Sequence, residues 1–338
     1  GSFIMTNKLC KLLGINNPII QIPIHTLTNG KMIAAISEAG ALGILGINSG
    51  YQINTDAISG ASASDTNEVG NFENYSILNT MTERNLMNEQ IDSALENTFR
   101  SFGIEIPIVA NLPEKDPTAL ALIQLMRKRR LTVALIETFN KSVSKEWINL
   151  LHQNGIKCLL QISSVKQAEK AIAAGVDALI CITPKINTIV KVAPNTPIVA
   201  GYNITNTESI KSAFNQGADG IAISTLFAVC KESPLNTKIK KQILDSKEKD
   251  LVKFKFPNKL IYSLPGTLPN KLAQMTNQNK DSKSIFDSAN RYQGLINGMG
   301  KGNLIAGYTD LDPDIDSINT ELAADQLVTN LINNIPTL

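Results

Sequence analysis

The sequence predicts an α/β fold of the (β/α)8 TIM-barrel class, and three observations support this prediction. Residues 18–46 read as an apolar strand, an amphipathic helix and a second apolar strand, which is a unit of a parallel sheet. Helix and strand patterns then alternate regularly from residue 82 to residue 223. A junction is also repeated, as Gly175-Val176-Asp177 and Gly217-Ala218-Asp219, where a glycine ends a helix and an apolar strand follows. A doubly wound open sheet fits less well, because no GxGxxG follows the first strand.

The expected elements follow from this pattern in order. The first strand is expected at residues 18–24, and Asn29-Gly30 begins a helix that Gly40 ends. Further strands are expected at residues 41–46, 106–111, 131–136, 156–161, 177–182, 197–200 and 220–223. Helices are expected at residues 82–101, 116–128, 144–153, 163–174 and 207–216, with a closing helix at 321–332.

Two insertions interrupt what reads as a single barrel domain of residues 8–338. Residues 48–81 form a polar insertion after strand 2 that contains no Lys or Arg, and we interpret it as a surface insertion or a lid. Residues 232–303 form a helical insertion after strand 8. Residues 1–4, which precede Met5, are interpreted as a tag remnant.

The composition favours a cytoplasmic protein without nucleic-acid or membrane partners. The net charge is only +2, and no apolar run approaches the ~18 residues of a membrane span. The N-terminus lacks the pattern of a signal peptide. Four scattered cysteines indicate a reducing compartment, at Cys10, Cys158, Cys181 and Cys230. No metal site is expected, because the only histidines, His25 and His152, lie far from any cysteine in the sequence.

Beyond these patterns, the sequence resembles the nitronate monooxygenase (2-nitropropane dioxygenase) family, FMN-binding TIM barrels that include enoyl-acyl-carrier-protein reductase II. Family members typically begin with P-I-I-Q-G-G-M, followed by A-x-x-x-S-x-A-G-G-L-G-I-(I/L)-G. This chain matches the second pattern at Ser37, Ala39, Gly40, Leu42, Gly43, Ile44 and Gly46. The first pattern differs, since it reads Gln21-Ile22-Pro23-Ile24. The resemblance covers roughly residues 8–335, broken by the polar insertion.

The resemblance implies FMN as the cofactor, with its phosphate held beyond strands 7 and 8. Backbone N–H groups and a helix N-terminus receive a phosphate at this place in such barrels. The family has glycine-rich turns there, whereas this chain has Gly201-Tyr202-Asn203 and Ser224-Thr225. A cap of the following helix by Asn203 and Thr205 is the alternative explanation. FMN is expected rather than FAD, because no Rossmann unit is present for an adenosine half.

Contacts to the flavin ring are also implied by the resemblance. Asn111 takes the place of a family asparagine near the ring, and Tyr308 the place of a family glutamine. The remaining candidates lie at the ends of strands 1 and 5, at Gln21, Ile22, Pro23 and Gln161. Ordinary turn or barrel-core roles are the alternative for the asparagine and the two glutamines.

The catalytic base that the resemblance implies is absent. Nitronate monooxygenases abstract a proton with a histidine in a G-G-H loop after strand 6, where this chain reads Ile182-Thr183-Pro184-Lys185. His25, just after strand 1, is the candidate catalytic residue, and Lys185 is the candidate for binding a substrate anion. His152 is expected on the outer ring of helices, and Cys181 is expected to be a core thiol.

These observations predict an FMN-dependent oxidoreductase that oxidises alkyl nitronates, a small-molecule substrate, with O2. Nitronates are already deprotonated, so loss of the base affects neutral nitroalkanes more. The alternatives are an enoyl-acyl-carrier-protein reductase II-like enzyme that uses NAD(P)H, and a catalytically degraded barrel that acts as a binding protein. Oligomerisation stays open.

Overall fold

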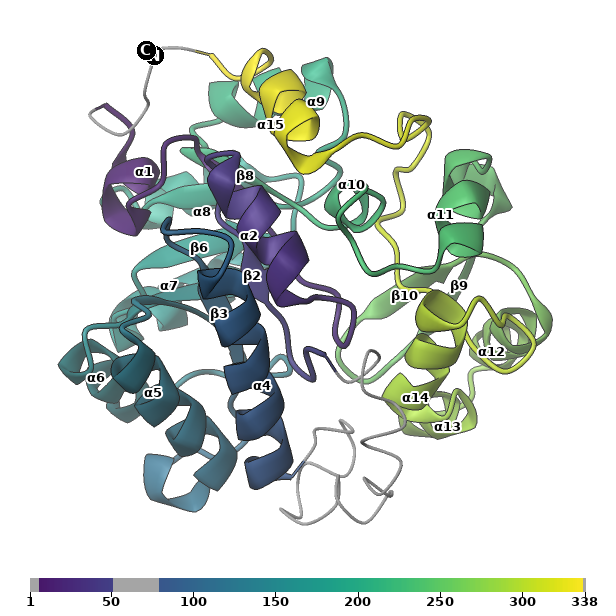
Figure 1. Cartoon of the computed structure of the whole chain (residues 1–338), viewed down its shortest axis with the longest axis horizontal. Helices are drawn as coiled ribbons and strands as arrows, with labels where there is room; N and C mark the ends of the chain where they lie inside the picture. Colours follow the sequence, from purple (N-terminus) through teal and green to yellow (C-terminus); the bar gives the residue numbers. More distant parts are fainter. Residues whose placement is uncertain (1–5, 51–78, 337–338) are drawn as a thin grey trace.

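The computed structural model describes residues 6–50 and 79–336, and the predicted tag remnant and most of the predicted polar insertion lie outside these residues. Eight parallel strands form one sheet in the order β1-β8-β7-β6-β5-β4-β3-β2, with helices around it (Figure 1). A parallel bridge between Ile20 and Leu42 joins β1 to β2, and the Gln21 N–H donates to the Leu42 carbonyl at 2.9 Å. The sheet therefore closes on itself, which confirms the predicted (β/α)8 barrel.

The barrel strands are short and their helices lie between them in the chain. The strands are β1 Ile19–Gln21, β2 Ile44–Leu45, β3 Gly103–Pro107, β4 Val133–Glu137, β5 Lys157–Ile162, β6 Ala178–Cys181, β7 Ile198–Ala200 and β8 Gly220–Ile223. The helices are α1 Lys8–Leu13, α2 Gly30–Glu38, α4 Thr80–Leu95, α5 Pro117–Arg129, α6 Lys145–Gln153, α7 Val165–Ala174, α8 Ile186–Val192, α9 Thr207–Asn215, α10 Thr225–Ala228 and α15 Ala324–Ile332. No helix in the described ranges has the length and apolar character needed to cross a bilayer.

The repeated glycine–aspartate junction has a structural cause. Gly175 and Gly217 follow α7 and α9 with φ of 100° and 106°, a left-handed conformation that costs glycine little. The carboxylate of Asp177 accepts from the Cys158 N–H at 2.7 Å, and that of Asp219 accepts from the Ile198 N–H at 2.8 Å. In each repeat, therefore, the glycine ends a helix, and the aspartate hydrogen-bonds to the backbone of a neighbouring strand.

Strand β3 lies earlier in the chain than the predicted residues 106–111. The Ile108 N–H still reaches the Glu137 carbonyl at 2.8 Å. Beyond this point the N–H groups of Val109 and Ala110 donate to the Asp116 carboxylate, at 2.9 and 3.2 Å. Asp116 also caps the N-terminus of α5. One side chain therefore ends the strand pairing of β3 and begins the next helix.

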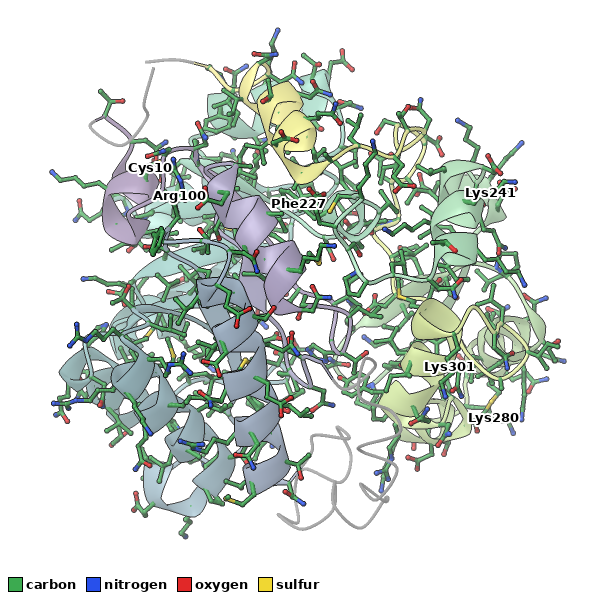
Figure 2. The ribbon with its side chains drawn as sticks, viewed as in Figure 1. Cys10, Arg100, Phe227, Lys241, Lys280 and Lys301 are labelled. Carbon is green, nitrogen blue, oxygen red and sulfur yellow. The ribbon has the colours of Figure 1, made fainter. Side chains whose placement is uncertain are left out.

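The insertion after β8 is not purely helical. It contains an antiparallel pair, β9 Val252–Lys255 and β10 Leu260–Ser263, with helices α11 Thr237–Leu244, α12 Thr267–Asn277, α13 Ser282–Ser288 and α14 Arg291–Leu295. We call this part the second lobe. It has its own hydrophobic cluster, which includes Phe254 and Tyr308 and meets the barrel through Ile24 of the loop after β1. Lys241, Lys280 and Lys301 extend from its surface (Figure 2).

Replacement of Asp116 by alanine should destabilise the fold strongly. The change leaves three buried or part-buried N–H groups, those of Val109, Ala110 and Ala119, without their acceptor. We expect a loss of about 2–4 kcal/mol in the free energy of unfolding, measured by urea denaturation. Glu114→Ala, an exposed acid in the same connection, is the matched control. Equal unfolding midpoints for the two variants would contradict this role of Asp116.

Candidate functional site

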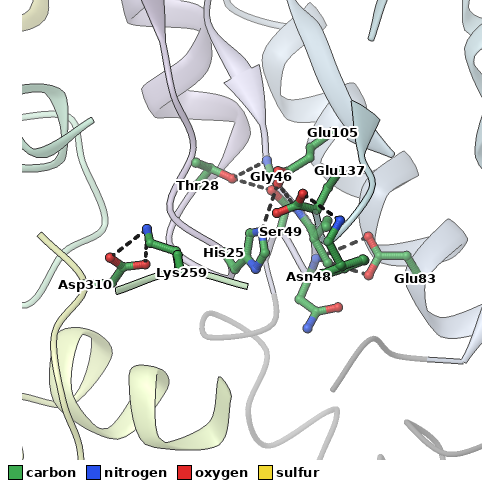
Figure 3. Close-up of polar contacts among 12 residues, drawn as sticks. His25, Thr28, Gly46, Asn48, Ser49, Glu83, Glu105, Glu137, Lys259 and Asp310 are labelled. Carbon is green, nitrogen blue, oxygen red and sulfur yellow. Dashed lines mark hydrogen bonds and ion pairs between the residues drawn. The ribbon is translucent and has the colours of Figure 1, made fainter. Parts of the chain in front are cut away.

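A cavity of about 290 Å³ lies at the carboxyl ends of the barrel strands, between the barrel and the second lobe. Loops that follow β1, β4, β5, β7 and β8 supply one wall. Residues 256–261 of the second lobe and residues 308–312, which follow it in the chain, supply the other wall. This is the face on which TIM-barrel enzymes place their active sites. Titratable side chains from both walls line it, and Figure 3 shows five of them, namely His25, Glu105, Glu137, Lys259 and Asp310. Lys141, Lys170 and Asp312 line it as well.

His25 is positioned by a strained turn in the loop that follows β1. The next residue, Thr26, has φ of 69°, which is uncommon for a β-branched residue, and its N–H donates to the Ile47 carbonyl at 2.9 Å. The His25 Nε2 atom lies 3.4 Å from Glu105 Oε1, and its ring packs edge-on against Tyr292. Burial opposes a charge on His25, but Glu105, with smaller contributions from other acids, outweighs it and raises the pKa of His25.

Two carboxylates face His25 from neighbouring strands. Glu105 of β3 accepts from the Ile47 N–H at 3.0 Å, and Glu137 at the end of β4 accepts from the Phe139 N–H at 3.1 Å. Burial and the nearby Glu105 charge raise the pKa of Glu137. Ligand atoms of these three side chains lie within 4.8 Å of one another. The sequence analysis does not predict this grouping, whose residue types also serve as metal ligands.

On the opposite side of the cavity, an aspartate occupies the start of helix α10. The Thr225 N–H donates to Asp312 Oδ2 at 3.0 Å, and the Asp312 N–H donates to the Thr225 hydroxyl at 2.7 Å. Burial raises the pKa of Asp312, although the Thr225 N–H and Lys259 act against this. Beside Asp312, Lys259 forms an ion pair with Asp310 at 3.0 Å.

Seven residues named by the sequence analysis line the cavity: Ile22, Pro23, His25, Gln161, Gly201, Ser224 and Tyr308. Tyr308 is almost fully buried, and its hydroxyl donates to the Arg291 carbonyl at 3.0 Å. Asn203, two residues after Gly201, has φ of 51°, and its side-chain oxygen is buried without a hydrogen-bond partner among the described residues.

Other named residues lie away from the cavity or are already engaged. The Gln21 side chain accepts from the Ile44 N–H at 2.6 Å inside the barrel, and Thr225 is engaged by Asp312. Tyr202 is 39% exposed. Asn111 and Lys185 are exposed and lie outside the cavity lining.

Two residues outside the predicted site behave as expected. The outer-helix histidine His152 pairs with Asp177 at 2.8 Å. Cys181 is fully buried in the core, and burial raises the pKa of its thiol to about 12.

Sequence reasoning missed the acids Glu105, Glu137 and Asp312, and the base Lys259. A signal existed for the first two, because each is a single carboxylate in an otherwise apolar strand, G-I-E-I-P and V-A-L-I-E. A charge in a strand buried on both faces is rarely tolerated without a partner. Lys259 and Asp312 had no such signal, since their partners are distant in sequence.

The comparisons with known proteins agree with this fold. The sequence model of the nitronate monooxygenase family matches residues 6–334 of this chain. A probable nitronate monooxygenase of Staphylococcus aureus (strain Newman) is 23% identical, with 97% of each chain covered. The structure is similar to FabK from Thermotoga maritima (TM-score 0.75, 20% identity, 97% of this chain and 95% of that one). It is also similar to nitroalkane oxidase from Streptomyces ansochromogenes (TM-score 0.68, 18% identity, 97% of each chain).

The barrel, with a polar cavity at the carboxyl ends of its strands, defines a TIM-barrel protein whose cavity lies on the face where such barrels place their active sites. The family match covers nearly the whole chain, so the chain belongs to the nitronate monooxygenase family, a family of flavin-dependent oxidoreductases. The two solved structures, at these identities, support the fold alone.

A flavin fits this site in part. At about 290 Å³, the cavity is close to the lower end of the usual range of ligand pockets, roughly 300–1,000 Å³. Ile22, Pro23, Gln161 and Gly201 offer the flavin apolar and amide surface. The phosphate of FMN does not fit the arrangement at Thr225, because Asp312 holds both its N–H and its hydroxyl.

The charge on His25 should depend on Glu105. Glu105→Gln removes the largest interaction that favours the charged ring, so the pKa of His25 should fall. Histidine-resolved NMR titration measures this directly, and His152 on the outer helix is the internal control. An unchanged pKa of His25 in the variant would show that Glu105 does not set its charge.

The same pair should make stability depend on pH. The pKa of His25 is raised above its ordinary value of 6.5, so its stabilising contribution is complete below about pH 6.5 and is lost as the pH rises through the folded-state pKa. Wild type should therefore lose more unfolding free energy than His25→Gln between pH 6 and pH 9, measured by urea denaturation. Parallel pH profiles for the two proteins would be evidence against this linkage.

Proposed function

We propose that this protein is a flavin-dependent oxidoreductase that acts on small organic anions, with alkyl nitronates as the substrate class. One observation carries the proposal, namely that the His25 ring lies 3.4 Å from Glu105 at the mouth of the cavity, where the carboxylate raises the pKa of His25 and so favours the protonated ring. A protonated ring in a cavity that Lys141 and Lys170 also line favours an anionic ligand.

The flavin would lie against Ile22, Pro23, Gln161 and Gly201 at the ends of four strands. When bound, a flavin supplies the electron acceptor for oxidation of the substrate. The sequence predicts FMN with Ser224 and Thr225 as its phosphate partners, but Asp312 engages Thr225, so the proposal is made for a flavin without naming its form.

His25 would act as an anion-binding residue rather than as a base. A base must be unprotonated to take a proton, and Glu105 favours the protonated ring. This supports a preference for preformed nitronates, which need no proton abstraction, over neutral nitroalkanes. Glu137 lines the cavity, and its raised pKa suits a general base, so slow use of neutral nitroalkanes would pass through it.

Steady-state oxygen consumption with a nitroalkane and its preformed nitronate tests these roles. His25→Ala should raise KM for the nitronate about tenfold or more, because it removes a charge-assisted contact. Glu137→Gln should abolish the residual use of the neutral nitroalkane and leave nitronate oxidation within about threefold of wild type. Lys185→Ala, an exposed residue away from the cavity, is the control for charge. Unchanged nitronate KM in His25→Ala would sink the proposed role.

NAD(P)H-dependent reduction of a crotonyl thioester, measured on the same preparation, tests the alternative predicted from the sequence. Enoyl reduction without nitronate oxidation would favour the reductase, and a protein inactive in both assays would favour a binding protein.

A further inference from the structure

We propose that Asp312 takes the place of the flavin phosphate, so that the cavity selects a flavin ending in a hydroxyl, such as riboflavin, over FMN. This inference rests on the proposed function, because it assumes that a flavin binds the cavity. It concerns which form of the flavin the site accepts.

The first step is the position of Thr225. It opens the short helix α10 directly after β8, beside the loop that follows β7. In TIM barrels this is where backbone N–H groups receive a phosphate. Any phosphate here would need the Thr225 N–H and hydroxyl as its donors.

The second step is that both of these groups are already used. The Asp312 carboxylate accepts from the Thr225 N–H at 3.0 Å and also from the Thr225 hydroxyl, and that hydroxyl in turn accepts from the Asp312 N–H at 2.7 Å. Thr225 is fully buried, so no second face of the residue is open to another anion. Asp312 is an internal anion at this helix start and supplies the charge that a phosphate would otherwise supply.

The third step concerns the charges of the side chains around this position. Asp310 and Asp312 both line the cavity, and Lys259 beside them is already paired with Asp310, whereas Lys141 and Lys170 line the cavity from the loop after β4 and from α7. A phosphate dianion placed here would meet carboxylates at short range, which is repulsive in a desolvated site.

The fourth step is the chemistry of Asp312 itself, which lines the cavity. A carboxylate oxygen accepts hydrogen bonds, so it favours a hydroxyl donor and disfavours a phosphate oxygen, which is itself an acceptor. A ribityl hydroxyl therefore suits this end of the cavity better than a phosphate does.

Titration of the protein with riboflavin and with FMN, followed by quenching of flavin fluorescence, tests the proposal without an activity assay. Wild type should bind riboflavin with a Kd roughly tenfold or more below that of FMN. Asp312→Asn keeps the shape and removes the charge, so it should lower the Kd of FMN about tenfold and leave that of riboflavin within about twofold. Asp314→Asn, whose carboxylate accepts from the Thr205 hydroxyl, should leave the ratio of the two Kd values unchanged.

Tighter binding of FMN than of riboflavin by wild type would overturn the proposal and leave the flavin-dependent function standing. Failure of both flavins to bind any variant would overturn the proposal and the proposed function together. The wild-type ratio is decisive even where Asp312→Asn does not fold.

Discussion

The burial of Glu105 inside the barrel is the constraint on which the rest of the site depends. Its side chain is only 3% exposed, and removing a carboxylate from water costs several kcal/mol unless partners replace the solvent. The Ile47 N–H and the His25 ring are those partners, so the loops after β1 and β2 must both approach β3. Gly46 permits this approach, because a Cβ there would lie 2.8 Å from Pro23. One buried charge thereby fixes the shape of the cavity mouth.

The barrel was predictable from sequence because its determinants are local. The glycine and aspartate of each repeat act on the helix before them and the strand beside them, and the apolar pattern of the first β-α-β unit needs no distant partner. The positions of Gly201 and His25 followed from the same reasoning, since Gly201 directly follows β7 and His25 lies in the loop after β1. Asn111 did not reach the cavity, because Asp116 takes over the hydrogen bonds that would have continued β3 to that residue.

The missing parts of the site depend on contacts that no local pattern carries. Thr225 and Asp312 are 87 residues apart, and Lys259 and Asp310 are 51 residues apart. The Asn140 side chain, in the loop after β4, also donates to the Asn258 carbonyl at 2.7 Å. The second lobe is therefore a wall of the site and not an appendage. Its charged side chains reach the cavity only when this part of the chain packs against the barrel.

The closure of the barrel has a consequence for how the chain is made. Strand β1 pairs with β8 through Ile19 and Ile221, and the Asn7 side chain donates to the Asp219 carbonyl at 2.7 Å. During synthesis, β1 therefore emerges about 200 residues before its partner on that side. Until β8 leaves the ribosome, one edge of the growing sheet stays open, and unpaired strand edges are prone to misassociation. The N-terminal segment thus forms its last native contacts late, and the nascent chain is at greatest risk just before β8 appears.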